Sequence, residues 1–171
     1  GTVTQHPGTE QLYMRIVPTV RAMLKARNPE KLNVPIIFTE IGFDSRKGAD
    51  LQMQALVKAY IMGAAQGVTM IHWFEGMDGD SGPMGIMDGK LNPRPAYQAL
   101  GEMIRLIGQQ PKFVGWVMPG EQQLGFVFQG TGGTVLCTWA TSKTGTEVDF
   151  GQNVKIVDPG TGAVTESAKI K

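Results

Sequence analysis

The sequence predicts an α/β fold followed by a small antiparallel β unit, and two observations support this. Two apolar runs, residues 34–40 and 68–75, alternate with stretches of helical periodicity over residues 9–107. Both runs are almost continuously hydrophobic, which is typical of parallel strands covered by helices. Beyond residue 110, short stretches rich in Val, Phe, Trp and Thr are separated by glycine and proline, as in antiparallel sheets.

The helices follow from spacing and from their end signals. Residues 9–27 place apolar side chains three and four apart, and Pro18 predicts a kink or a late start in this helix. Residues 49–66 form a second amphipathic helix that Gly67 ends. A third helix begins in the run from Pro93 to Leu100 and closes at Gly108. We expect about five short strands in the remaining sixty or so residues, too few for a robust independent core.

Composition excludes several classes of partner and site. Sixteen Lys and Arg nearly balance fifteen Asp and Glu, and no basic cluster indicates a nucleic acid or an anionic membrane as partner. Cys137 is the only cysteine, so an intrachain disulfide and a cysteine-ligated zinc site are both excluded. No apolar run is long enough to span a bilayer. The acidic loop 77–82 resembles a calcium loop only weakly, so we expect a flexible rim and no metal or other cofactor.

Two carboxylates lie at the ends of the predicted strands. Glu40 ends the first strand and Glu75 ends the second. In α/β barrels the carboxyl ends of the strands meet at the open mouth, where catalytic groups gather. Glu40 is therefore the first candidate for a catalytic residue, although a strand-end carboxylate could also cap a helix or form a salt bridge. By strand alternation His72 should pack under the outer helices, on the face opposite Trp73.

Three motifs occur here in a specific order: Thr39-Glu40-x-Gly42, a strand containing Trp73, and a helix that begins Pro93-x-Pro-Ala-Tyr-x-Ala-Leu. Together they resemble the last quarter of a clan A retaining glycoside hydrolase, over roughly residues 10–108. The resemblance implies the C-terminal portion of a (β/α)8 TIM barrel, namely two βα units with flanking helices. The β unit after it resembles the accessory β-sandwich of such enzymes. We expect a barrel portion at residues 1–110 and a small all-β domain at residues 111–171.

The same resemblance assigns roles to residues. It implies that Glu40 is the nucleophile, that Trp73 is the floor of the subsite where a β-linked oligo- or polysaccharide is cleaved, and that the protein needs no cofactor. A cis peptide bond between Trp73 and Phe74 is expected. Glu75 could bind a sugar hydroxyl, anchor a loop or, as a rival, act as the acid/base. The family's own acid/base glutamate follows an asparagine, and this chain contains no Asn-Glu pair.

Retaining hydrolysis needs two carboxyl groups, and a barrel needs eight strands. We therefore expect the chain to be a C-terminal fragment of a longer enzyme, inactive alone, whose partner is the missing N-terminal portion of the barrel. Two alternatives stay open: a barrel remnant that binds carbohydrate without cleaving it, and a barrel of different chemistry such as an aldolase or a metal-dependent hydrolase. The residues indicate no cellular compartment, and the resemblance is compatible with a secreted or periplasmic protein.

Overall fold

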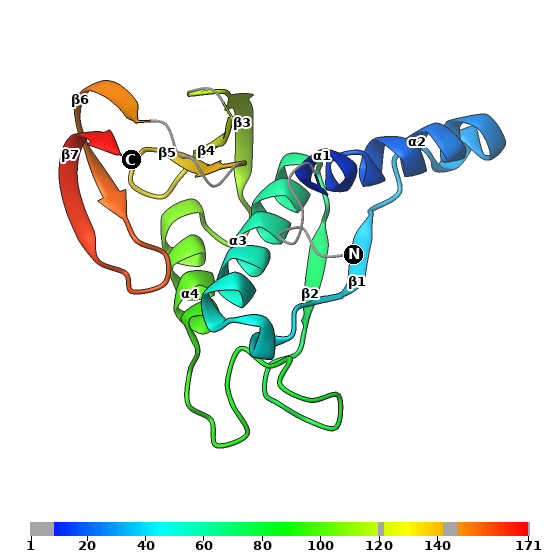
Figure 1. Cartoon of the computed structure of the whole chain (residues 1–171). Helices are drawn as coiled ribbons and strands as arrows, with labels where there is room; N and C mark the ends of the chain where they lie inside the picture. Colours follow the sequence, from blue (N-terminus) through cyan, green and yellow to red (C-terminus); the bar gives the residue numbers. More distant parts are fainter. Residues whose placement is uncertain (1–8, 120–121, 142–146, 171) are drawn as a thin grey trace.

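The chain has a mixed α/β architecture (Figure 1). The computed structural model describes residues 9–119, 122–141 and 147–170. Four helices are present in this part of the chain: α1 Thr9–Tyr13, α2 Ile16–Arg27, α3 Ala49–Ala65 and α4 Pro95–Ile107. Seven strands are present in it: β1 Ile37–Gly42, β2 Met70–Phe74, β3 Lys112–Val117, β4 Gln123–Gln129, β5 Thr134–Ala140, β6 Val148–Val157 and β7 Val164–Ile170. Short 3-10 turns occupy Pro29–Lys31 and Ser45–Lys47.

β1 and β2 pair in parallel, which confirms the prediction from their continuous apolar character. Figure 1 shows α3 and α4 together on one side of this pair. The contact between the layers is close at Gly63 of α3, where an added Cβ would lie 2.4 Å from the Ile71 Cδ1 atom. Tyr60 of α3 also donates a hydrogen bond to the carbonyl of Ile71. One face of the strand pair is thus covered by helices.

The opposite face of the strand pair is open in the described structure. Ile37 of β1 and its neighbour Met70 of β2 are 46% and 50% exposed. β1 pairs only with β2 among the described residues, and β2 only with β1. Each strand therefore presents a row of backbone donors and acceptors that has no strand beside it.

The first helical stretch is split in two at Met14–Arg15. Pro18 lies in the first turn of α2, where its missing N–H costs little, but its ring would clash with the carbonyl of Met14 in a continuous helix. This is the late start that Pro18 predicted. Within this region Tyr13 and Val17 are buried, and the Tyr13 ring meets Phe38 edge-on. Most of the predicted apolar stripe is exposed: Leu12, Ile16, Val20 and Met23.

The predicted antiparallel unit is present. β3, β4 and β5 form a three-stranded sheet in that order, and β6 pairs with β7. The structure changes from helix to strand between residues 107 and 112, as expected, whereas the division into two domains stays a prediction. Of the aromatic side chains in this unit, Phe126 and Phe128 are buried, and Trp116 is 64% exposed.

The β unit and the helices share one hydrophobic core. Its buried members come from α1, α3, the loop before α4, α4 and β4: Tyr13, Leu56, Ala59, Ile61, Met62, Ile86, Ala96, Met103, Ile107, Phe126 and Phe128. An ion pair reinforces this junction, because Lys58 Nζ lies 3.0 Å from Glu10 Oε1 and 5.6 Å from the centre of the Trp139 ring. The small sheet thus obtains from the helices the core that it is too short to build alone.

Candidate functional site at the carboxyl end of the parallel strands

Glu40 lies in an irregularity of β1. The pairing with β2 shifts between Phe38 and Ile41, and both of these side chains pack against the core. The shift leaves Thr39 and Glu40 exposed between them. The strand continues to Gly42, two residues beyond the predicted end, so Glu40 precedes the last residues of the strand rather than ending it.

Glu40 lines an open hollow of about 580 Å3. Its other lining residues come from the N-terminal helices, from β1, from the end of β2 and from the loop after it: Tyr13, Ile16, Ile37, Phe38, Thr39, Ile41, Gly42, Phe74 and Met84. Among the described residues that line this hollow, Glu40 is the only acidic one, and none is Lys, Arg or His. The hollow therefore combines the Glu40 carboxylate with a mixed lining in which apolar side chains predominate.

Gly42 explains the glycine of the Thr-Glu-x-Gly motif in physical terms. A Cβ at this position would lie 2.2 Å from the carbonyl oxygen of Phe74, the residue paired with Gly42 in β2. The same Cβ would lie 3.0 Å from the Cε atom of Met84. Any larger residue would push the carboxyl ends of the two strands apart at the level of the hollow.

Trp73 occupies a different place from the one predicted. It lies two residues after Ile71, so by strand alternation it shares the face that packs against α3. Its ring packs against the core, and its buried Nε1 has no hydrogen-bond partner among the described residues. The expectation that the indole lies beside Glu40 in an open cavity is wrong, and Phe74 lines the hollow instead.

Two further expectations for β2 are also corrected by the structure. His72 was expected under the helices, but it is exposed, with Nε2 2.8 Å from the sulfur of Met70. The non-proline cis bond joins Phe74 and Glu75 and not Trp73 and Phe74. In a strand that is apolar on both faces, the sequence does not indicate which set of alternate residues faces the helices.

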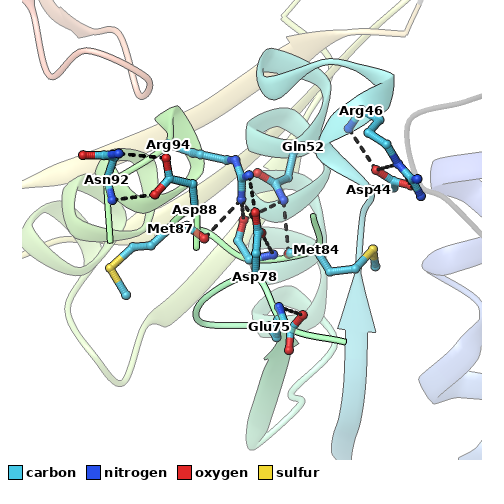
Figure 2. Close-up of polar contacts among 12 residues, drawn as sticks. Asp44, Arg46, Gln52, Glu75, Asp78, Met84, Met87, Asp88, Asn92 and Arg94 are labelled. Carbon is cyan, nitrogen blue, oxygen red and sulfur yellow. Dashed lines mark hydrogen bonds and ion pairs between the residues drawn. The ribbon is translucent and has the colours of Figure 1, made fainter. Parts of the chain in front are cut away.

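Glu75 follows β2 and belongs to the loop rather than to the hollow. Its Oε1 accepts a hydrogen bond from the Gly79 N–H at 3.2 Å (Figure 2). Its backbone N–H donates to Met84, and its carbonyl accepts from Ile86. Of the roles that the sequence left open for Glu75, loop anchoring is the one that these contacts support.

The loop 75–94 is held by an ion pair between Asp78 and Arg94. Arg94 Nη1 and Nη2 lie 2.7 Å from Asp78 Oδ1 and Oδ2, a bidentate arrangement. Nη1 also donates to the carbonyls of Gly85 and Met87, and Asp78 Oδ1 accepts from the Gly85 N–H. Hydrogen bonding from Arg94 holds the pKa of Asp78 below its usual value. These bonds anchor the loop at Asp78 and Gly85, and the flexibility expected of the rim between them stays a prediction.

Gln52 fixes the same loop from the side of α3. Its side chain is fully buried, and Nε2 donates to the carbonyls of Phe43, Met84 and Gly85 at 3.0, 3.2 and 3.0 Å. Figure 2 shows Gln52 and Arg94 reaching the loop together. Phe43 follows β1, so one side chain joins the segment after Glu40 to the loop after β2.

Two further carboxylates near the site are held by neighbouring side chains. Asp44 accepts hydrogen bonds from the guanidinium and the backbone N–H of Arg46, and these bonds lower the pKa of Asp44. Asp88 binds Asn92 in the same way. In the described part of the chain no group of three or more His, Cys, Asp and Glu could hold a metal ion.

No protein-family model matches this chain, and no curated protein matches its sequence. Among the described residues, no helix is long and apolar enough to cross a membrane.

Residues that sequence reasoning missed are Gln52, Phe74, Met84 and the Asp78–Arg94 pair. Arg94 stands between two prolines at the start of α4, so the sequence indicated a restricted backbone there. It did not indicate that Asp78 would be the partner of Arg94.

Proposed function

We propose that this chain is the C-terminal part of a retaining glycoside hydrolase of clan A and that Glu40 is its nucleophile. One observation supports this most directly. Glu40 is exposed near the carboxyl end of a parallel strand and is the only acidic residue among the described ones that line the adjacent hollow. In (β/α)8 barrels that end of the strands holds the catalytic groups.

The partner of this chain, in the proposal, is the rest of a TIM barrel. A parallel pair covered by helices on one face and open on the other is an incomplete arrangement, since parallel sheets are almost always covered on both faces. A second hollow, of about 360 Å3, is lined by β2 and the helices: Tyr60, Ala64, Val68, Thr69, Met70, Ile71, Leu100, Met103, Ile104, Ile107, Gly108, Gln109 and Pro111. Further parallel strands beside β1 and β2 would cover these apolar surfaces. The sheets after residue 111 would form the accessory β-sandwich.

The chemistry is a double displacement in which Glu40 supplies one of two carboxyl groups. A Glu40 oxygen bonds to the anomeric carbon as the glycosidic bond breaks, and an acid elsewhere in the protein gives its proton to the leaving oxygen. The same group then takes a proton from water, whose oxygen displaces Glu40 and restores both carboxyl groups. The second carboxyl must lie about 5 to 5.5 Å from the first. Glu75 is unsuited to this role because its carboxylate is bonded within its own loop.

The substrate in this proposal is a β-linked oligo- or polysaccharide. Trp73 is not among the residues that line the hollow beside Glu40, so the proposal depends on Glu40 and on the arrangement of the strands. A non-catalytic barrel that only binds carbohydrate is the second candidate, favoured by the same observation, because the described residues place no second carboxylate beside Glu40. Substitution of Glu40 separates the two.

The test begins with the size of the native protein. An antibody against this chain should detect a polypeptide well above its 18.5 kDa. The full-length protein is then incubated with 2,4-dinitrophenyl 2-deoxy-2-fluoro-β-glycosides, which leave a slowly hydrolysed glycosyl group on the nucleophile. Mass spectrometry should find this group on the peptide that contains Glu40, and Glu40→Gln should abolish both the label and turnover. A native protein of 18.5 kDa, a label on another residue, or undiminished turnover in Glu40→Gln would refute the proposal.

A further inference from the structure

The side chain of Met84 stands beside the end of β1. Its Cε atom lies 3.0 Å from the position that a Cβ on Gly42 would occupy, and Met84 lines the hollow together with Phe74 and Glu40. Met84 comes from the loop after β2 and Glu40 from β1, so the loop adds a wall next to the proposed nucleophile. Methionine is unbranched and adaptable, which suits contact with an irregular apolar surface.

The backbone that presents Met84 is bonded on all sides. The Met84 carbonyl accepts from Gln52 Nε2 and from the Glu75 N–H, both at 3.2 Å, and the Met84 N–H donates to Gly82 at 2.8 Å. The carbonyl of Pro83 accepts from the Ser45 N–H at 3.0 Å. These bonds tie the segment to α3, to the end of β2 and to the segment after β1, which limits the positions that Met84 can take.

The next residue is fixed as tightly. Gly85 is held by the Asp78–Arg94 pair, which bonds both its N–H and its carbonyl. A Cβ at Gly85 would lie 2.4 Å from the Met87 carbonyl oxygen and 2.5 Å from the Asp78 nitrogen, so the backbone approach here requires glycine. Figure 2 shows this network beside Met84. The loop is thus preorganised around one apolar side chain.

We propose that Met84 and Phe74 form the apolar wall against which the glycosyl unit attacked by Glu40 packs, and that Gln52 and the Asp78–Arg94 pair position Met84. This inference rests on the proposed function. The C–H groups of a sugar ring are the part of the substrate that such a wall accepts. Among the described residues the lining has one carboxylate and no Lys, Arg or His, so the hollow takes a neutral glycosyl unit and disfavours a carboxylated one.

The test uses the full-length protein and p-nitrophenyl β-glycosides of glucose, galactose, xylose, mannose and glucuronic acid. Met84→Ala should lower kcat/KM for the best neutral substrate about tenfold, mainly through KM, because apolar contact is lost. Met84→Leu should retain most of it. The matched control is Met77→Ala, which truncates an exposed methionine of the same loop outside the hollow and should leave KM unchanged. An unchanged KM in Met84→Ala, or a glucuronide hydrolysed as well as the neutral substrates, overturns the inference.

A second set of variants tests whether Arg94 positions Met84, and its readout is KM. Arg94→Lys keeps the charge but loses the bidentate bond, and it should raise KM. If Arg94 acts through Met84, the double variant Arg94→Lys/Met84→Ala should have the KM of Met84→Ala alone; additive effects would refute the positioning role. Glu40→Gln separates failure of the apolar wall from failure of the proposed hydrolase function. If it abolishes turnover while Met84→Ala does not alter KM, only the wall is refuted, whereas turnover in Glu40→Gln refutes the hydrolase itself.

Discussion

Replacing Gln52 by methionine tests whether the loop after β2 is held by one buried amide. The substitution nearly conserves side-chain volume and removes the hydrogen bonds to three carbonyls. Two of these carbonyls keep another donor, since Met84 accepts from Glu75 and Gly85 accepts from Arg94. The Phe43 carbonyl loses its bond to Nε2.

The expected loss of stability follows from the hydrogen bonds that these three carbonyls lose and keep. A buried carbonyl left without a donor costs about 1–3 kcal/mol, and two weakened sites add a fraction of that. Removal of the Gln52 Oε1 atom, which is buried and has no partner among the described residues, offsets part of the loss. We expect Gln52→Met to reduce the free energy of unfolding by about 2 kcal/mol, which lowers Tm by about 4–8 °C in a domain of this size.

The assay is urea and thermal unfolding of the purified protein, followed by tryptophan fluorescence. The control is Gln98→Met on α4, an exposed side chain whose single hydrogen bond runs to Glu102 at 3.3 Å, and it should change stability by less than about 0.5 kcal/mol. A Gln52→Met variant as stable as Gln98→Met would show that the buried amide does not hold the loop.

Three further predictions concern the strands, the loop and the core. Gly42→Ala should destabilise the protein by more than about 3 kcal/mol in urea unfolding, because the new Cβ would lie 2.2 Å from a backbone oxygen. Asp78→Asn should be less stable than the parent at pH 7. Because the pKa of Asp78 is lowered from 3.8 on folding, its stabilising effect is complete above pH 4 and is lost as pH falls through the folded-state pKa, so the two stability curves should converge at low pH. Lys58→Met should cost about 3 kcal/mol by leaving Glu10 buried without its cation, and the double variant Lys58→Met/Glu10→Leu should recover most of this loss.

Matched controls exist for these variants. Gly101→Ala, in α4, has no atom within 4 Å of the new Cβ and should be neutral or stabilising. Asp80→Asn removes an exposed carboxylate of the same loop and should change stability at pH 7 by less than about 0.5 kcal/mol. The argument for Gly42 would be contradicted by a Gly42→Ala variant as stable as Gly101→Ala. The argument for Asp78 would fail if the stability curves of the parent and Asp78→Asn stayed apart at pH 2. The argument for the ion pair would fail if Lys58→Met/Glu10→Leu were no more stable than Lys58→Met.

The sequence by itself determined the order and type of the elements. Periodicity and end signals gave α3, α4 and their terminal glycines, because helix formation depends on residues three and four apart. Two apolar runs predicted the parallel pairing of β1 and β2, which the structure has. The turn residues beyond residue 110 predicted the antiparallel sheets. Pro18 predicted the late start of α2.

Only the tertiary structure decided which side chains share the site. The sequence singled out Glu40 because it ends an apolar run, and the structure places it at the hollow. Trp73 was expected in the same cavity but faces α3, because a strand that is apolar on both faces does not indicate which alternate residues face the helices. Gln52 bonds to backbone carbonyls, which every residue has, so its partners leave no trace in the sequence. Arg94 bonds to two carbonyls and to the Asp78 carboxylate, and nothing in the sequence pairs it with that acid rather than another. The bonds from Gln52 to Gly85 and from Arg94 to Asp78 join residues 33 and 16 positions apart. Such contacts exist only after α3, α4 and the two strands have packed.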